Sequence, residues 1–246
     1  MTKAAFKTVR FDFKGKRALV VGGSRGIGKA LVRAFLGTGA DVVYAARAPM
    51  AGRTRATFVK TDVRDEGAVK RLFSAVDKRG GLDFAINMAG INHTKTIDRI
   101  AAAEWDDVLA VNLRAAFLVC REAAGRMKAK GRGSIVNVSS IAGRHRSPVS
   151  GVHYVSSKAG LIGLTRQLAF ELSPFGVNVN AVCPSQTMTD MLKESMTPAQ
   201  RKKLAAAIPL RRLATVDDQV GPILFLCSDA AAYITGAVID VNGGQI

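Results

Sequence analysis

Hydrophobic residues gather in short runs of strand length, and these alternate with longer amphipathic segments of helix length. The runs predict strands at Arg17–Val21, Asp41–Ala46, Thr57–Lys60, Leu82–Asn87, Ser134–Ser139, Val177–Val182 and Ala237–Val241. The amphipathic segments predict helices at Gly26–Leu36, Glu66–Arg79, Glu104–Lys128, His153–Leu172, Asp190–Ala207 and Val216–Leu226. Strands that are apolar almost throughout are typical of a sheet buried on both faces. We therefore predict an α/β fold, a doubly wound (Rossmann) parallel sheet of about seven strands with helices on both faces.

No repeat, low-complexity tract or linker divides the chain, so residues 1–246 are predicted to form a single domain. The stretch between Arg47 and Asp62 is too short for a full helix, and we expect a loop or a single turn there. Residues 185–212 are charged and less regular, which favours a substrate lid.

Composition excludes several classes of protein. No apolar run reaches the roughly 18–20 residues of a membrane span, and the first residues lack the apolar core of a signal peptide. We expect a cytoplasmic protein without a membrane partner. Cys120, Cys183 and Cys227 are widely spaced in apolar segments, which predicts three buried free thiols and no metal site.

The net charge is +17, from 36 basic and 19 acidic residues. The basic residues are dispersed and no aromatic residues interleave with them, which argues against nucleic acid as a partner. A dispersed basic surface and an attraction for anionic small molecules both fit this pattern. Because Arg144 and Arg146 closely follow Ser140, we hypothesise that they present positive charge to an anionic substrate.

A glycine-rich segment joins the first predicted strand to the first predicted helix. Glycines in such a turn permit unusual backbone angles and let a pyrophosphate approach the helix N-terminus. A turn that merely packs is the alternative, but the position inside the first strand–helix–strand unit favours a dinucleotide site. The predicted cofactor contacts here are Gly22, Ser24, Arg25, Gly26, Ile27 and Gly28.

The ends of the next strands give further cofactor contacts. The second strand ends at Arg47 without the acidic residue that an NAD site places there, and Arg25 with Arg47 could clamp a 2′-phosphate. We therefore predict NADP(H), the alternative being that one arginine simply faces solvent. We predict the remaining contacts, to the adenine and the ribose, at Asp62, Val63, Asn87, Ala89 and Gly90. The alternative is that these residues only form ordinary strand-end turns.

Tyr154 and Lys158 are four residues apart, so they share one face of a predicted helix. The Lys158 ammonium is expected to lower the pKa of Tyr154 from about 10 and make it a proton-transfer group. Ser140, at the end of the fifth strand, could hydrogen-bond a substrate carbonyl oxygen or merely cap a turn. Asn112, polar within an apolar helix, could hold a water linking Lys158 to solvent or simply pack. A serine hydrolase is disfavoured because Ser139 and Ser140 lack the Gly-x-Ser-x-Gly pattern.

Together these segments resemble the short-chain dehydrogenase/reductase family from Arg17 to Gly244. The glycine-rich turn, Asn87-Met-Ala-Gly90 and a tetrad of Asn112, Ser140, Tyr154 and Lys158 carry the resemblance. It implies that the tetrad is catalytic, that Tyr154 and Lys158 also contact the cofactor, and that Thr187 and Thr189 meet the nicotinamide carboxamide. It also implies a homotetramer built on the helices that carry Asn112 and Tyr154 and on the C-terminal segment.

Within this family the chain is similar to the 3-oxoacyl-[acyl-carrier-protein] reductases, through Thr189-Asp-Met191 and Tyr233-Ile-Thr-Gly236 among other segments. The resemblance implies an NADPH-dependent carbonyl reductase acting on a 3-oxoacyl thioester. Because dehydrogenases of sugars, polyols and cyclic alcohols share these segments, such a dehydrogenase is the alternative. Phe175 stands where the carrier-protein reductases often have a docking arginine. A non-catalytic NADPH-binding module is the alternative from another class.

Overall fold

The computed structural model describes residues 9–189, 192–193 and 196–246. Across these residues, seven parallel strands form one sheet in the order β3-β2-β1-β4-β5-β6-β7, which confirms the predicted doubly wound fold. All strand ends lie within two residues of their predicted positions. The strands are β1 (Arg17–Val21), β2 (Asp41–Ala46), β3 (Thr57–Lys60), β4 (Phe84–Asn87), β5 (Gly133–Val138), β6 (Val177–Pro184) and β7 (Val238–Val241).

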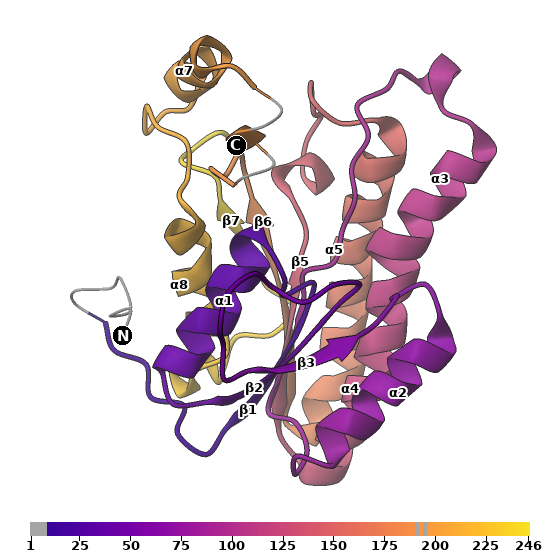
Figure 1. Cartoon of the computed structure of the whole chain (residues 1–246), viewed down its shortest axis with the longest axis vertical. Coiled ribbons are helices and arrows are strands. Elements are labelled where there is room, and N and C mark those ends of the chain that lie inside the picture. Colours follow the sequence, from indigo (N-terminus) through magenta and orange to yellow (C-terminus); the bar gives the residue numbers. More distant parts are fainter. Residues whose placement is uncertain (1–8, 190–191, 194–195) are drawn as a thin grey trace.

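Helices cover both faces of this sheet (Figure 1). One face carries α1 (Gly26–Gly37) and α8 (Val216–Leu226), and the other carries α2 (Glu66–Asp77), α4 (Ala115–Lys130) and α5 (Val152–Leu172). Because successive strand residues point to opposite faces, Val20 packs with α1 and α8 while its neighbours Leu19 and Val21 pack with α2 and α4. Both faces of each central strand are therefore apolar, as the sequence pattern predicts.

The predicted helix over Glu104–Lys128 is interrupted. In the structure, α3 (Ala102–Leu109) is followed by a π-helical turn at Ala110–Arg114, and α4 continues from there to Lys130. The spacing of hydrophobic residues along the sequence did not indicate this π-helical turn. Asn112 lies inside it and is buried, and π-helical turns are frequent at functional sites.

The helix predicted over Asp190–Ala207 also differs. The described helix α7 spans Pro198–Ala207, and Thr197 before it is extended and caps it. Thr197 Oγ1 accepts from the Gln200 backbone N–H at 3.2 Å, and Gln200 Oε1 accepts from the Thr197 N–H at 2.8 Å. A single helix through Thr197 is therefore wrong, whereas residues 190–191 and 194–195 lie outside the described residues.

The carboxyl ends of the central strands meet at one edge of the sheet. Val21 pairs with Asn87 and Asn87 pairs with Asn137, so β1, β4 and β5 end side by side. The predicted loop between Arg47 and Asp62 is confirmed, because residues 47–56 are all described and contain no helix. Ligands of open α/β sheets bind at this edge.

Three aromatic rings anchor the first strand–helix unit to β4. The ring centroid of Phe35, on α1, lies 5.8 Å from that of Phe13 and 5.9 Å from that of Phe84. Phe35 is fully buried, so Phe35→Ala should reduce the free energy of unfolding by about 3–5 kcal/mol, measured by urea denaturation. Phe35→Leu keeps most of the apolar volume and should cost clearly less. A loss below about 1 kcal/mol for Phe35→Ala would contradict this account of the core.

Candidate functional site

The turn after β1 depends on two glycines. Gly22 has a φ of 89°, and a Cβ there would lie 2.8 Å from the backbone nitrogen of Ala89. At Gly28 a Cβ would lie 2.2 Å from the Gly22 carbonyl oxygen, a distance that no side chain can occupy. The absence of these side chains brings α1 close against β1 and the end of β4. The N-terminus of α1 therefore opens directly onto the sheet edge.

A cavity of about 650 Å³ lies at this edge. Its volume is within the range of small-molecule and cofactor sites. Twelve of the predicted cofactor residues line it: Gly22, Ser24, Arg25, Gly26, Ile27, Gly28, Arg47, Asp62, Val63, Ala89, Gly90 and Thr189. Residues that the sequence analysis did not select also line it: Ala45, Ala46, Ala48, Thr61, Arg64, Met88, Ile91, Asp107 and Val111. Asp107 and Val111 are four residues apart, a helical spacing that could have suggested a shared face.

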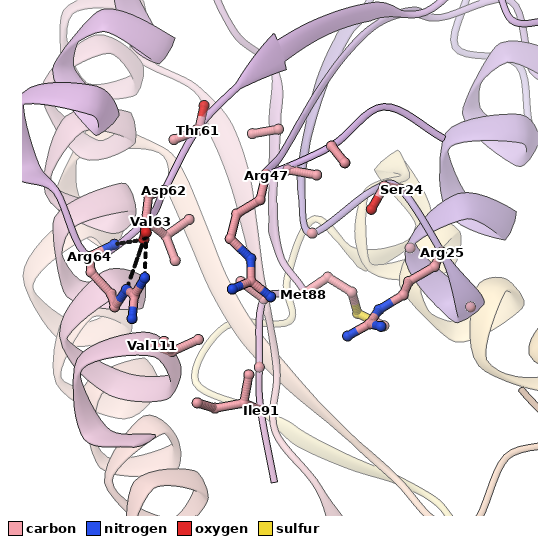
Figure 2. A pocket seen from close by; sticks show the side chains of 18 of the residues that line it. Ser24, Arg25, Arg47, Thr61, Asp62, Val63, Arg64, Met88, Ile91 and Val111 are labelled. Atoms are coloured by element: carbon pink, nitrogen blue, oxygen red, sulfur yellow. Dashed lines mark hydrogen bonds and ion pairs between the residues drawn. The ribbon is translucent and has the colours of Figure 1, made fainter. Parts of the chain in front are cut away.

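Arg25 and Arg47 both extend into the cavity, as Figure 2 shows. Arg25 comes from the residue before α1, and Arg47 directly follows β2. Among the described residues, neither guanidinium has a carboxylate within ion-pair distance. Two cationic groups of this kind can bind an anion, because a guanidinium presents several donors in a fixed fork.

Asp62 is bound by a neighbour that the sequence analysis missed. The Arg64 guanidinium donates to both Asp62 carboxylate oxygens, at 3.0 Å from Nε to Oδ1 and 2.6 Å from Nη2 to Oδ2. This hydrogen bonding lowers the pKa of Asp62 to about 2. Arg64 Nη1 also donates to Asp107 Oδ1 on α3 at 2.8 Å. The Asp62 carboxylate is thus ionised and held in place beside the cavity (Figure 2).

Ser140, Tyr154 and Lys158 come together outside the lining of the cavity, and Lys158 lies next to Gly90, which lines it. Ser140 follows β5, while Tyr154 and Lys158 lie on the first two turns of α5. The Ser140 side chain lies close enough to the Tyr154 hydroxyl to act on its pKa in the lowering direction. Lys158 Nζ lies 5.7 Å from the centroid of the Tyr154 ring and donates to the Val138 carbonyl at 2.8 Å. Ser140 Oγ also accepts from the Ala142 N–H at 3.1 Å, so this side chain caps a turn as well.

Burial determines the direction of both pKa shifts. It raises the pKa of the Tyr154 hydroxyl, against which the Ser140 side chain acts in the opposite direction. Burial also lowers the pKa of Lys158 to about 8. The expected lowering of the Tyr154 pKa is therefore wrong for this arrangement, because desolvation of the phenolate outweighs the stabilising contacts. Tyr154 is held in its protonated form at neutral pH.

Asn112 links the chain after β4 to α5. Its Oδ1 accepts from the Ile91 N–H at 2.8 Å, while its Nδ2 donates to the Ile91 carbonyl at 2.9 Å and to Ser157 Oγ at 3.0 Å. Ser157 Oγ in turn donates to the Tyr154 carbonyl at 2.7 Å. A Cβ on Gly90 would lie 3.5 Å from both Asn112 Oδ1 and Lys158 Nζ. The π-helical turn thus brings Asn112 next to Gly90, which lines the cavity.

Comparison with known proteins gives the family. A family model described as enoyl-(acyl carrier protein) reductase matches residues 21–245. The chain belongs to the short-chain dehydrogenase/reductase family. It is 38% identical over 245 residues to protein FixR of Bradyrhizobium diazoefficiens, covering 94% of this chain and 86% of that protein. It is 35% identical over 249 residues to the 3-oxoacyl-[acyl-carrier-protein] reductase FabG of Aquifex aeolicus, covering 96% of this chain and all of that protein (100%).

A solved structure supports the same assignment. The crystal structure of a putative gluconate dehydrogenase from Agrobacterium tumefaciens matches with a TM-score of 0.87 and 30% identity, covering 97% of this chain and 98% of that one. Short-chain dehydrogenase/reductases use nicotinamide cofactors, so this chain is an oxidoreductase that acts on CH–OH or carbonyl groups. The cavity fits such a cofactor, because the glycine turn removes the side chains that would block a pyrophosphate and two unpaired guanidinium groups stand beside it.

Four predicted cofactor contacts do not line this cavity: Asn87, Tyr154, Lys158 and Thr187. Asn87 is buried and donates to Asn137 Oδ1 at 2.6 Å, since the strand pleat turns its side chain into the sheet's interior. Thr187 is also buried; it donates to the Ser185 carbonyl at 3.0 Å and accepts from Gln219 Nε2 at 3.3 Å. Of the pair predicted to meet the nicotinamide, Thr189 alone faces the cavity.

The predicted basic run after Ser140 is partly neutralised. Arg144 Nη2 lies 3.2 Å from Asp240 Oδ2, on β7, so its charge is paired. Arg144 lines a second hollow with His145, Arg166 and the C-terminal residues instead of the cavity described above. Arg146 is exposed and has no ion pair with any residue that the structure describes.

Three further observations concern the cysteines, metal ions and membrane-spanning helices. Cys120, Cys183 and Cys227 are free and buried, as predicted. The described residues hold no group of three or more His, Cys, Asp or Glu side chains that could bind a metal ion. Over the same residues, no helix is both long enough and apolar enough to cross a membrane.

The lowered pKa of Lys158 gives a test of the site's electrostatics. The unfolded chain keeps the Lys158 proton up to a pH of about 10.5, whereas the folded chain releases it near 8. Between these values the unfolded state binds more protons, so the stability of the folded state rises with pH. From about pH 7 to about pH 9.5 the wild type should gain about 2 kcal/mol relative to Lys158→Met, measured by urea denaturation of both proteins. Parallel pH profiles for the two proteins would show that Lys158 is not desolvated.

Proposed function

We propose that this short-chain dehydrogenase/reductase is an NADPH-dependent carbonyl reductase that acts on 3-oxoacyl thioesters. The observation that carries the proposal is the group formed by Ser140, Tyr154 and Lys158 beside a cavity with two unpaired arginines. The likeness to the Aquifex FabG supports the substrate class. The catalytic residues are Asn112, Ser140, Tyr154 and Lys158, and the cofactor residues are those that line the cavity together with Tyr154 and Lys158.

Within this proposal the chain's own residues supply and position a proton. A nicotinamide cofactor, held by the residues that line the cavity, would supply the hydride for the substrate's carbonyl carbon. Ser140 donates a hydrogen bond that orients the carbonyl oxygen, and Tyr154 protonates that oxygen. Tyr154 carries its proton at neutral pH, as a general acid must, while burial, which raises its pKa, makes that proton harder to transfer. Lys158 and Asn112 lie behind Tyr154 and could return a proton to it from solvent.

NADPH preference rests on Arg25 and Arg47. Both guanidinium groups project into the cavity without an ion pair to any residue that the structure describes, and no acidic residue follows β2 to accept a ribose 2′-hydroxyl. Asp62, whose carboxylate feels the charge of Arg47, is itself paired with Arg64. A 2′-phosphate therefore meets two free cations at this place.

The remaining assignments are coarser. Residues 185–212, which include α7, are proposed as the substrate lid, and we expect a cytoplasmic homotetramer. Exposed apolar side chains on α4 and α5, Phe117, Val152 and Phe170, support an interface on these helices. Arg146 is exposed and could attract an anionic substrate, so we retain an anionic substrate as part of the proposal.

A dehydrogenase of a sugar acid, polyol or cyclic alcohol is the second candidate. The likeness to the putative gluconate dehydrogenase favours it, and so does Phe175, which stands exposed under Lys128 where carrier-protein reductases often have an arginine. The two candidates are separated by NADPH and NADH oxidation assays with 3-oxoacyl thioesters, cyclic ketones and keto-sugars. Turnover with the thioesters supports the first candidate, and turnover confined to the other groups supports the second.

The role of Tyr154 is tested by Tyr154→Phe, which removes only the hydroxyl. We expect the rate of carbonyl reduction to fall by about 10²–10⁴-fold, because general acid catalysis is lost. The dissociation constant for NADPH, measured by its fluorescence, should rise far less, because the Tyr154 hydroxyl is only one of many proposed cofactor contacts. Tyr233→Phe is the matched control, since Tyr233 is fully exposed. Full activity of Tyr154→Phe would refute the proposed mechanism.

Cofactor preference is tested by Arg47→Asp. Loss of a charge-assisted contact and repulsion of the 2′-phosphate should raise the dissociation constant for NADPH by about 10–100-fold, with little change for NADH. Arg53→Asp, at an exposed position outside the cavity, controls for the change in net charge. Equal effects on both cofactors, or none, would show that Arg47 does not read the phosphate.

A further inference from the structure

A buried imidazole immediately precedes Tyr154. His153 lies on the first turn of α5 and is fully buried. Its Nδ1 accepts the backbone N–H of Tyr154 at 2.8 Å. The Tyr154 N–H also donates to the Gly151 carbonyl at 3.1 Å, so the imidazole is the nearer of two acceptors for this group. The imidazole therefore adds a side-chain contact to the backbone of the residue proposed to donate the proton.

This contact fixes the tautomer of His153. Because Nδ1 accepts a hydrogen bond, the ring proton resides on Nε2. Nε2 lies 3.3 Å from Glu104 Oε1 on α3, so its N–H donates to the carboxylate. The other Glu104 oxygen accepts from Lys95 Nζ, and this hydrogen bond lowers the pKa of Glu104. His153 thus joins the Tyr154 backbone to an ionised carboxylate on a different helix.

Hydrogen bonds also connect the start of α5 to the segment that follows the cavity residues Gly90 and Ile91. The Gly151 N–H donates to the His93 carbonyl at 3.0 Å, and Thr94 Oγ1 donates to the Val149 carbonyl at 2.9 Å. His93 and Thr94 follow Gly90 and Ile91, which line the cavity. The rings of His93 and His153 lie 6.1 Å apart between centroids. A Cβ on Gly151 would lie 2.5 Å from the His153 ring, so the imidazole can occupy this place only because residue 151 has no side chain.

We propose that His153 and Glu104 form a positioning pair that sets the place of Tyr154 relative to the cavity. The pair acts through the Tyr154 backbone and contacts neither substrate nor cofactor. A buried histidine that only fills space would need neither a defined tautomer nor a carboxylate from α3. The inference rests on the proposed function of Tyr154, and it extends that function to two residues outside the tetrad.

The test compares variants that keep or remove each contact. His153→Phe fills the site without hydrogen bonds and should lower kcat by about 10–100-fold, with the KM for the carbonyl substrate and the dissociation constant for NADPH nearly unchanged. His153→Asn places an oxygen near the Nδ1 position and should recover much of kcat. Glu104→Ala should resemble His153→Phe, and the double variant should be little worse than either single one, because the two residues act as a unit.

Controls separate positioning from folding. Glu171→Ala removes an exposed carboxylate on α5 and should leave kcat unchanged. Thermal midpoints identify any variant that fails to fold; if His153→Phe does so, Glu104→Ala and His153→Asn decide the matter. The proposal is overturned if His153→Phe keeps kcat within about twofold, or if the losses in the double variant simply add.

A second readout does not depend on turnover. Hydrogen exchange followed by mass spectrometry on peptides covering 151–158 should be faster in His153→Phe than in the wild type, with the rest of α5 unchanged. If the wild type reduces no carbonyl, the proposed function fails, and this exchange result alone decides whether the pair holds the first turn of α5. Unchanged protection overturns the positioning role in either case.

Discussion

The close contact between Gly22 and Gly28 is the constraint on which the site depends. A single methyl group at Gly28 would collide with the Gly22 carbonyl, and one at Gly22 would collide with the backbone of Ala89. The turn therefore ties three elements together, namely β1, α1 and the end of β4, without any side chain between them. The cavity, the helix N-terminus and the chain that continues to Asn112 all take their positions from this contact.

Two buried groups of the candidate site, Lys158 and Tyr154, lower the stability of the folded protein in their charged forms. Lys158 is buried, and its ammonium donates to the Val138 carbonyl. Its lowered pKa shows that removing the ammonium from water makes the free energy of folding less favourable. Tyr154 next to it carries a raised pKa for the same reason. The apolar core on both faces of the sheet must offset this cost. The charge of Arg64 does not carry this cost, because it is paired at the surface with the carboxylates of Asp62 and Asp107.

Sequence reasoning reached the fold and most of the cavity because those depend on local patterns. Strand length, apolar content and the glycine spacing are properties of adjacent residues, and they placed every strand and the turn after β1. Arg64 with Asp107 and His153 with Glu104 pair across 43 and 49 residues, so no local pattern announces them. Asn87 was misplaced because a strand-end pattern does not say which face the last side chain takes. The π-helical turn around Asn112 was missed because its residues keep an ordinary helical composition.

The loop between β2 and β3 gives the two ends of the cavity different freedom to change. Residues 47–49 and 51–53 are exposed and no helix packs on them, so substitutions there disturb little of the core. The charge at Arg47, which we propose to lie next to the cofactor's ribose, can therefore vary during evolution almost independently of folding. At the opposite end, Asn112, His153 and Lys158 are buried among hydrogen bonds, and a change at any of them is felt by the fold as well as by the chemistry. The arginine proposed to select the cofactor is thus a surface residue, whereas the residues proposed for proton transfer are part of the interior.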